Sequence, residues 1–143
     1  MYSFKNDYSE VAHINILRKL AEFSLEKNIG YGMDYHSENA KQHLKRHIGR
    51  DDVDIHFMVG GTGTNKTVIS HVLKPYEAVI ACDTGHINVH ETGTVEATGH
   101  KVVIAKGYDG KVSVEGIREV VKYHTDEHMV LPRMVYISVT SEI

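Results

Sequence analysis

The first 50 residues carry the pattern of amphipathic helices. From Ser9 to Lys27, apolar side chains recur every three to four residues, and charged side chains occupy the other face. The stretch Gly30-Tyr31-Gly32 interrupts this pattern. A second helix is predicted from Ser37 to Ile48, with Gly49 at its end. The pattern therefore predicts an N-terminal helical segment over residues 1–50.

From residue 51 onward, short apolar runs alternate with helical stretches. The runs that predict strands are Asp54–Val59, Ala78–Cys82, Lys101–Ile104 and Met134–Val139. The predicted helices are Thr62–Leu73, with Thr62 as its cap and Pro75 beyond its end, Asn88–Ala97, before Gly99, and Ser113–His124. Strands that alternate with helices favour an α/β fold with a mostly parallel sheet and flanking helices, so we expect residues 51–143 to form one structural unit. Ligands of such sheets bind beyond the carboxyl ends of the strands, which makes residues 60–64 and 83–90 the candidate segments.

Composition and charge narrow the class of protein. A chain of 143 residues has the length of one domain, and its 41% hydrophobic and 24% charged residues are typical of a globular protein. The net charge of −3 argues against a nucleic-acid binder, and no apolar run reaches the roughly 18 residues that cross a bilayer. The first residues lack the pattern of a secretory signal, and the single cysteine, Cys82, cannot form an internal disulfide. We therefore expect a cytoplasmic protein with no nucleic-acid or membrane partner.

A glycine-rich turn, Gly60 to Asn65, joins a predicted strand to a predicted helix. Glycines let the backbone approach a ligand closely, and the N–H groups at a helix start bind anions, so a phosphate is the natural ligand. Residues 60–67 also nearly match the nucleotide-binding loop G-x-x-x-x-G-K-[ST], although Asn65 stands at the second glycine. In that case Asp83, which follows an apolar strand, would suit a magnesium ion. The turn alone leaves a phosphate cradle, a nucleotide-binding loop and a tight turn without ligand as open interpretations.

The 11 histidines invite a metal or a cofactor interpretation. His86 and His90 are four residues apart, and Glu91 or His100 would have to supply a third zinc ligand. The pattern is weak and lacks the H-E-x-x-H arrangement of zinc proteases, so we predict no metal site. A second role for His86 is that of a flat ring near the phosphate turn, where it could stack on an aromatic cofactor and transfer a proton.

Several stretches together resemble one family. They are residues 6–13 and 30–34, the Gly61-Thr62 turn with Asn65, and Tyr76–Ile80, Asp83–Gly93 and Glu96–Val102. In this order, and without large gaps, they are similar to the threonine aldolases, which are grouped with the β-eliminating lyases among the fold-type-I pyridoxal-phosphate enzymes. The resemblance covers nearly the whole chain. It implies the first half of the large domain of such enzymes, with residues 51–143 as an incomplete cofactor-binding domain.

The resemblance implies a cofactor site in the α/β part. Gly61 and Thr62 resemble the family's cradle for the phosphate of pyridoxal phosphate, and Asn65 resembles a polar support beside it. His86 resembles the histidine that stacks on the pyridoxal ring near the substrate hydroxyl, which implies a catalytic role. Gly60 stands where relatives often carry Ser, and this departure removes one possible phosphate hydroxyl.

The resemblance also implies residues on the substrate side and a partner. Asn6 and Asp7 correspond to an N-terminal segment that lies close to the substrate in the family. Tyr31 corresponds to a segment that serves a neighbouring subunit, because family members build active sites at dimer interfaces. A sheet edge left open at the last strand is a further reason to expect a homo-oligomer, a dimer or a tetramer.

The implied function is that of a pyridoxal-phosphate-dependent lyase or aldolase acting on a β-hydroxy amino acid such as threonine. In the family the Schiff-base lysine lies on later strands, and no lysine here matches its position, while Val135–Ile143 resembles the strand that leads toward that half. We therefore expect this chain to be inactive alone. It would be the product of a truncated gene, a fragment whose other half is a separate chain, or a protein with a new role. The alternatives are a phosphate- or nucleotide-binding module that uses Gly60–Thr67, and a non-catalytic oligomerising fragment.

Overall fold

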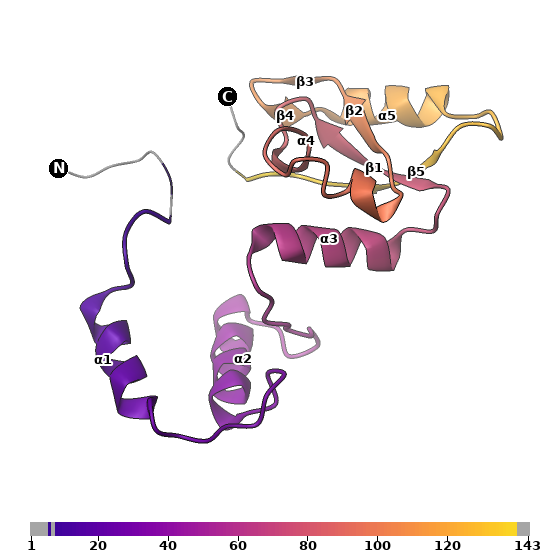
Figure 1. Cartoon of the computed structure of the whole chain (residues 1–143). Coiled ribbons are helices and arrows are strands. Elements are labelled where there is room, and N and C mark those ends of the chain that lie inside the picture. Colours follow the sequence, from indigo (N-terminus) through magenta and orange to yellow (C-terminus); the bar gives the residue numbers. More distant parts are fainter. Residues whose placement is uncertain (1–5, 7, 140–143) are drawn as a thin grey trace. The chain divides into compact units, whose positions relative to one another are not determined.

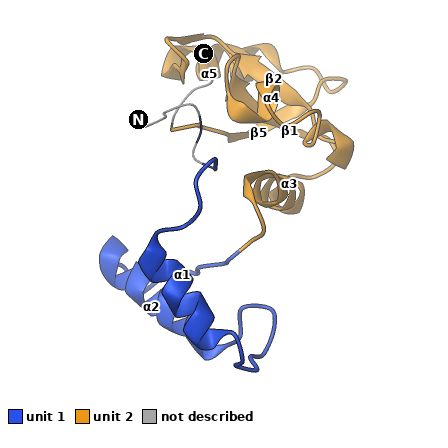
Figure 2. Ribbon diagram, turned by 60° about the vertical axis from the view of Figure 1, so that its left-hand side comes forward, with its two compact units in different colours: residues 1–57 blue, residues 58–143 orange. Residues whose placement is uncertain are grey.

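The computed structural model describes residue 6 and residues 8–139. It divides into two compact units, Met1–Phe57 (unit 1) and Met58–Ile143 (unit 2), which Figure 2 shows in blue and orange. The sequence pattern divides the chain after residue 50 by the type of secondary structure, whereas these two units are divided by compactness. The predicted division after residue 50 therefore remains a prediction. None of the helices within the described residues is long and apolar enough to span a bilayer.

Unit 1 holds two helices, α1 (Ile14–Phe23) and α2 (Tyr35–Ile48), where the sequence predicts them. The carboxylate of Asp34 caps the start of α2, because it accepts hydrogen bonds from the Ser37 backbone N–H at 2.8 Å and from the Ser37 hydroxyl at 2.6 Å. Gly49 ends α2 with a left-handed φ of 74°. Local capping therefore sets both ends of α2.

The apolar face of α1 is not covered. This helix is shorter than the predicted range of residues 9–27, and Ile14, Ile16, Leu17 and Leu20 remain 40% to 60% exposed. No described residue up to Phe57 is buried. Within its described residues, unit 1 thus has helices that local signals explain and no buried core.

The predicted strand Asp54–Val59 is wrong. The described strands form one three-stranded and one two-stranded sheet, and neither includes these residues. An extended segment becomes a strand only when a neighbour satisfies its backbone N–H and C=O groups. The apolar run is therefore left as irregular chain, with Phe57, Met58 and Val59 all exposed.

Unit 2 is built around a parallel three-stranded sheet with the strand order β2-β1-β5 (Figure 1). The strands are β1 (Glu77–Cys82), β2 (Val102–Ala105) and β5 (Leu131–Val135). All six residues of β1 are buried, as expected for the central strand of a parallel sheet. The predicted α/β class with a mostly parallel sheet is confirmed.

Alternate residues of β1 belong to two separate cores. The first core lies toward α3 (Gly61–Val72) and α4 (His86–Val89), and it consists of Ile69, Leu73, Val79, Ala81, Ile87 and Val95. The second core lies toward α5 (Val114–Tyr123), and it consists of Ala78, Ile80, Val103, Ala105 and Val120. Because successive side chains of a strand point to opposite faces, helices cover both sides of β1. This arrangement fixes the position of α3 and α4 relative to the sheet.

The segment after β1 differs from the prediction. In place of one helix over Asn88–Ala97, the chain forms α4 and a separate 3₁₀ turn, η1 (Glu96–Thr98). Thr92 and Gly93 lie between them with φ values of 52° and 72°. α4 has ended by then, at Val89, and a left-handed backbone cannot continue a right-handed helix, so no single helix runs through residues 88–97. Gly99 ends η1 in the left-handed conformation, as its position after the predicted helix suggested.

The last part of the chain also departs from the pattern. β5 covers Leu131–Val135, whereas the apolar run predicted residues 134–139. The pairing with β1 stops at Val135, which lies opposite Ile80, and the Tyr136 N–H still donates to the Ile80 carbonyl at 2.8 Å. β1 itself continues to Cys82 and still pairs there with β2, so it is the chain after Val135 that leaves the sheet. A short antiparallel ribbon of β3 (Gly107–Tyr108) and β4 (Lys111–Val112) was not predicted, since two-residue strands leave no periodic signal.

Candidate functional site

The glycine-rich turn starts α3 in unit 2. Gly60 is the N-cap of the helix, with a φ of 70° and no side-chain cap, so the prediction of Thr62 as the cap is wrong. The first N–H groups of a helix have no acceptor within the helix, and here no cap side chain occupies that position. A Cβ built on Gly60, Gly61 or Gly63 meets no atom within 4 Å. The turn therefore has open space beside its glycines.

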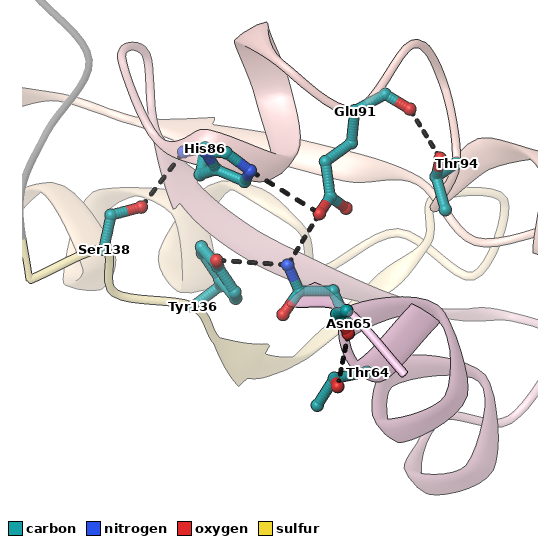
Figure 3. A network of polar contacts seen from close by, with 8 residues as sticks. Thr64, Asn65, His86, Glu91, Thr94, Tyr136 and Ser138 are labelled. Atoms are coloured by element: carbon teal, nitrogen blue, oxygen red, sulfur yellow. Dashed lines mark hydrogen bonds and ion pairs between the residues drawn. The ribbon is translucent and has the colours of Figure 1, made fainter. Parts of the chain in front are cut away.

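The threonine hydroxyl at position 64 is already engaged. Thr64 Oγ1 donates a hydrogen bond to the Gly60 carbonyl at 2.8 Å and closes the first turn of α3 (Figure 3). Its hydroxyl proton is directed at the protein backbone and is not left for a ligand. The anion-binding capacity of this turn thus rests on backbone N–H groups and on Thr62.

His86 begins α4, four residues after Cys82 at the carboxyl end of β1. Its backbone N–H donates to Ser138 Oγ at 3.0 Å, which ties α4 to the segment that follows β5. Its Nε2 lies 3.8 Å from Glu91 Oε1, and 38% of its side chain is exposed. Its ring centre is 5.9 Å from that of His90, with the two planes inclined by 50°. His86 is thus anchored by its backbone and presents a partly open ring.

Asn65 and His86 meet at one carboxylate. The Asn65 side-chain amide donates to Glu91 Oε1 at 2.8 Å and to the Tyr136 hydroxyl at 3.3 Å (Figure 3). Glu91 has a fully buried side chain. The network connects α3, the segment after α4 and the segment after β5, which are distant in sequence. Asn65 and His86 were predicted site residues, and the structure brings them together through Glu91.

Sequence reasoning missed part of this network. Glu91 was considered only as a zinc ligand, and neither Tyr136 nor Ser138 was selected. A signal was available, because Tyr136 and Ser138 are polar groups two residues apart at the end of an apolar strand, and therefore share a face. Parallel strands bring such positions to the same edge as the residues after β1.

Asp83, the candidate magnesium ligand, has neighbours in the chain itself. The Cys82 thiol donates to Asp83 Oδ1 at 2.9 Å, and the Thr84 N–H donates to the same oxygen at 2.9 Å. These hydrogen bonds, with that of Cys82 the larger, lower the pKa of Asp83 below its ordinary value of 3.8. One of the two carboxylate oxygens of Asp83 is thus engaged in a local turn.

The zinc interpretation finds no third ligand. His100 is buried with its Nδ1 3.2 Å from the Glu77 carbonyl oxygen, and Glu91 is bonded to Asn65. Within residues 6 and 8–139, a group of three possible metal ligands does lie close together. It consists of Asp126, Glu127 and His128, which are exposed, consecutive in sequence and have ligand atoms within 4.8 Å of one another. The described structure therefore does not assemble His86 and His90 with a third ligand.

The remaining predicted residues lie in unit 1 or outside the described residues. The Asn6 side chain accepts a hydrogen bond from the Tyr8 N–H at 3.2 Å, and Tyr31 is fully exposed with a φ of 65°. Asp7 lies outside the described residues. The place of Asn6, Asp7 and Tyr31 beside a substrate stays a prediction.

A small cavity lies beside the network but does not have the size of a cofactor site. Its volume is about 90 Å³, and its lining includes Gly85, Tyr136 and Ser138. Typical ligand pockets begin near roughly 300 Å³. This cavity by itself therefore does not accommodate a cofactor.

Comparison with known proteins decides the family. Residues 14–143 of this chain match the family described as "Beta-eliminating lyase". The chain belongs to the beta-eliminating lyase family. Among solved structures, threonine aldolase from Leishmania major superposes with a TM-score of 0.94 at 47% identity, over 99% of this chain and 42% of that one. The fold is therefore that of part of a threonine aldolase.

Two sequence relatives in this lyase family carry the same name. A low specificity L-threonine aldolase from Pseudomonas sp. (strain NCIMB 10558) is 30% identical over 115 residues, which is 79% of this chain and 33% of that protein. A low specificity L-threonine aldolase from Pseudomonas aeruginosa is 26% identical over 126 residues, or 87% of this chain and 36% of that protein. This beta-eliminating lyase chain thus spans about a third of the length of these relatives. The resemblance that the motifs predicted is confirmed.

Proposed function

We propose that this chain is the N-terminal part of a pyridoxal-phosphate-dependent aldolase or lyase acting on a β-hydroxy amino acid such as threonine. The observation that carries the proposal is the convergence of the α3 turn, Asn65 and His86 at the carboxyl edge of the parallel sheet. Ligands of open α/β sheets bind at this edge. The relatives named L-threonine aldolase support the substrate class.

The residues present fit the phosphate end of such a cofactor. Gly60 leaves the start of α3 without a side-chain cap, and the space around Gly61 and Gly63 is open. A phosphate can therefore accept hydrogen bonds from the backbone N–H groups of the first turn, where the helix dipole also favours a negative charge. Thr62 lies in that turn and would add a hydroxyl donor.

The residues beside the turn fit the ring end. When bound, pyridoxal phosphate supplies an electron-withdrawing ring that stabilises negative charge at the substrate α-carbon. His86 has a partly open imidazole that can lie against that ring and accept the proton of the substrate β-hydroxyl. Asn65 keeps the buried carboxylate of Glu91 hydrogen-bonded next to it. This chain's contribution is thus to bind phosphate, place a ring and hold a proton acceptor.

These 143 residues contain no lysine that matches the family's cofactor-anchoring position. We therefore expect them to bind the cofactor reversibly and not to turn over substrate by themselves. Asn6, Asp7 and Tyr31 would serve the substrate side, with Tyr31 acting across the interface of a homo-oligomer. A cytoplasmic location agrees with the buried free thiol of Cys82.

The test is a titration of the purified chain with pyridoxal phosphate, followed by absorbance, before and after borohydride, and by intact mass. We expect saturable binding that inorganic phosphate weakens by competition, and no mass fixed by borohydride. His86→Ala should weaken binding, whereas His71→Ala, at an exposed position in the last turn of α3, should not. A mass fixed on one lysine would show a substitute anchor and contradict the expected inactivity. Stabilisation by ATP with magnesium in place of pyridoxal phosphate would instead favour the nucleotide-binding alternative.

A further inference from the structure

Glu91 is a charged side chain in a position where proteins rarely keep one. Its side chain has no solvent exposure, and its backbone is held by the Thr94 hydroxyl, which donates to the Glu91 carbonyl. One carboxylate oxygen, Oε2, is buried without a hydrogen-bond partner among the described residues. Burying a carboxylate that is only partly satisfied costs free energy. An apolar residue or a glutamine would fill this position at lower cost, so packing alone does not explain the carboxylate.

The partners of Glu91 explain the buried carboxylate better than packing does. Its Oε1 accepts from the Asn65 amide at 2.8 Å and lies 3.8 Å from His86 Nε2. Asn65 belongs to the first turns of α3, next to the proposed phosphate cradle, and His86 opens α4. One oxygen thus stands between the two ends of the proposed cofactor site. It faces the edge of the His86 ring that carries Nε2.

We propose that Glu91 is a positioning residue of the cofactor site: its carboxylate holds the His86 ring in a fixed orientation relative to the start of α3, with Asn65 as the brace. The inference rests on the proposed function, since a fixed ring has a use only if a cofactor lies against it. Glu91 itself would contact neither the phosphate nor the pyridoxal ring of the cofactor. It acts through His86.

One variant separates the contact of Glu91 with Asn65 from its contact with His86. Glu91→Gln keeps the length of the side chain and an oxygen that accepts from Asn65, but it removes the negative charge facing His86. Glu96→Gln makes the same chemical change at an exposed position of the same segment and serves as the matched control. A purely structural role of Glu91 would not depend on His86, so the variants are measured with and without His86→Ala.

The experiment is a double-mutant cycle on pyridoxal-phosphate affinity in the full 143-residue chain. We expect Glu91→Gln to weaken binding about tenfold when His86 is present and less than about twofold in the His86→Ala background. Glu96→Gln should leave the affinity unchanged. In the chain without cofactor, the side-chain ¹⁵N signals of His86 should move in Glu91→Gln, while those of the distant, exposed His71 should not.

Each outcome of the experiment either supports or overturns the inference. Equal losses with and without His86 would assign Glu91 a structural role and overturn the inference, while the proposed function would stand. Unchanged affinity in Glu91→Gln, or unmoved His86 signals, would overturn it too. Absence of binding by the unsubstituted chain would overturn the proposed function and the inference together. Should Glu91→Gln fail to fold, Thr94→Val loosens the backbone anchor and keeps the carboxylate; its effect on affinity must then also vanish in the His86→Ala background.

Discussion

The two units use the same kinds of residues to opposite effect. In unit 1, α1 and α2 form at the places that periodicity and capping predict, yet no described residue there is buried. In unit 2, six consecutive residues of β1 are buried and two apolar clusters flank them. Local signals are therefore enough to define a helix, whereas a core needs partners from several distant segments.

This difference bears on where function can be built. A site needs side chains held by their surroundings, and in the described chain the network around Glu91 lies in the unit that has a core. Its members come from α3, from the segment after α4 and from the segment after β5. Tyr31, a predicted residue of unit 1, is fully exposed and does not belong to this network. The comparison can be tested with matched substitutions in the two units.

The largest expected effect is on the core. Ile80→Ala removes a side chain that is 2% exposed, and it should lower the free energy of unfolding of unit 2 by about 2–5 kcal/mol. Ile16→Ala removes the same side chain from α1, where it is 53% exposed, and should change the free energy by less than about 0.5 kcal/mol. Urea unfolding followed by circular dichroism measures both. A loss of several kcal/mol in Ile16→Ala would show that the face of α1 is buried in the protein in solution.

A smaller effect is expected for a hydrogen bond between an amide and a carboxylate. Asn65→Ala leaves the buried Glu91 without its amide donor and should cost about 1–3 kcal/mol. Gln42→Ala removes a bond of the same type and the same length, 2.8 Å, from Gln42 to Glu38 on the exposed surface of α2. That loss should be about 0.2–0.5 kcal/mol, because water replaces the lost partner. Similar losses in the two variants would mean that burial does not strengthen the Asn65 contact.

The left-handed glycines give a third comparison. Gly49 ends α2 with a φ of 74°, and Gly99 ends η1 with a φ of 88°; a Cβ at either position meets no atom within 4 Å. Alanine at each therefore adds only backbone strain, of about 1 kcal/mol. Gly99→Ala should lower the unfolding midpoint of unit 2, and Gly49→Ala should reduce helix content without moving that midpoint. Far-UV circular dichroism at increasing urea concentration distinguishes the two results, and a midpoint shift in Gly49→Ala would show that the end of α2 contributes to the stability of unit 2.

The smallest effect is a pH dependence at a helix cap. The hydrogen bonds from the Ser37 hydroxyl, and then from its N–H, lower the pKa of Asp34 below its ordinary value of 3.8. The cap therefore stabilises α2 fully above that value, and its contribution is lost as the pH falls through the lower pKa of the folded state. Asp34→Asn should remove this acid dependence, because an amide does not titrate.

The matching cap in unit 2 should not respond to acid. Ser113 begins α5 with a hydroxyl that accepts from the Gly116 N–H at 2.9 Å, and a hydroxyl has no charge to lose. Helix content measured from neutral to acidic pH, in the chain and in Asp34→Asn, checks the difference. An acid transition of equal size in both proteins would locate its cause elsewhere than Asp34.

The sequence predicted the parts of the fold that depend on short-range pattern. β1 and β2 follow from apolar runs, and α2, α3 and α5 from periodicity with their caps or stops, within a few residues. The run Asp54–Val59 has as strong a strand pattern as β1, but the described chain offers it no partner. Strand pairing is a long-range property, so no local pattern could separate these two cases.

The candidate site likewise has features that follow from local sequence and features that depend on long-range contacts. Residue type and position after a strand were enough to select Asn65 and His86, since a phosphate turn and a flat ring need those chemical groups. Sequence could not show that Glu91 joins them, nor that Tyr136 and Ser138 complete the network, because these contacts cross 26, 71 and 52 positions of the chain. The sequence by itself determined which groups are available and the helices that local capping defines. The tertiary structure alone decided which groups meet, because only the packing of α3 and α4 on one face of β1 brings such distant positions within hydrogen-bond distance.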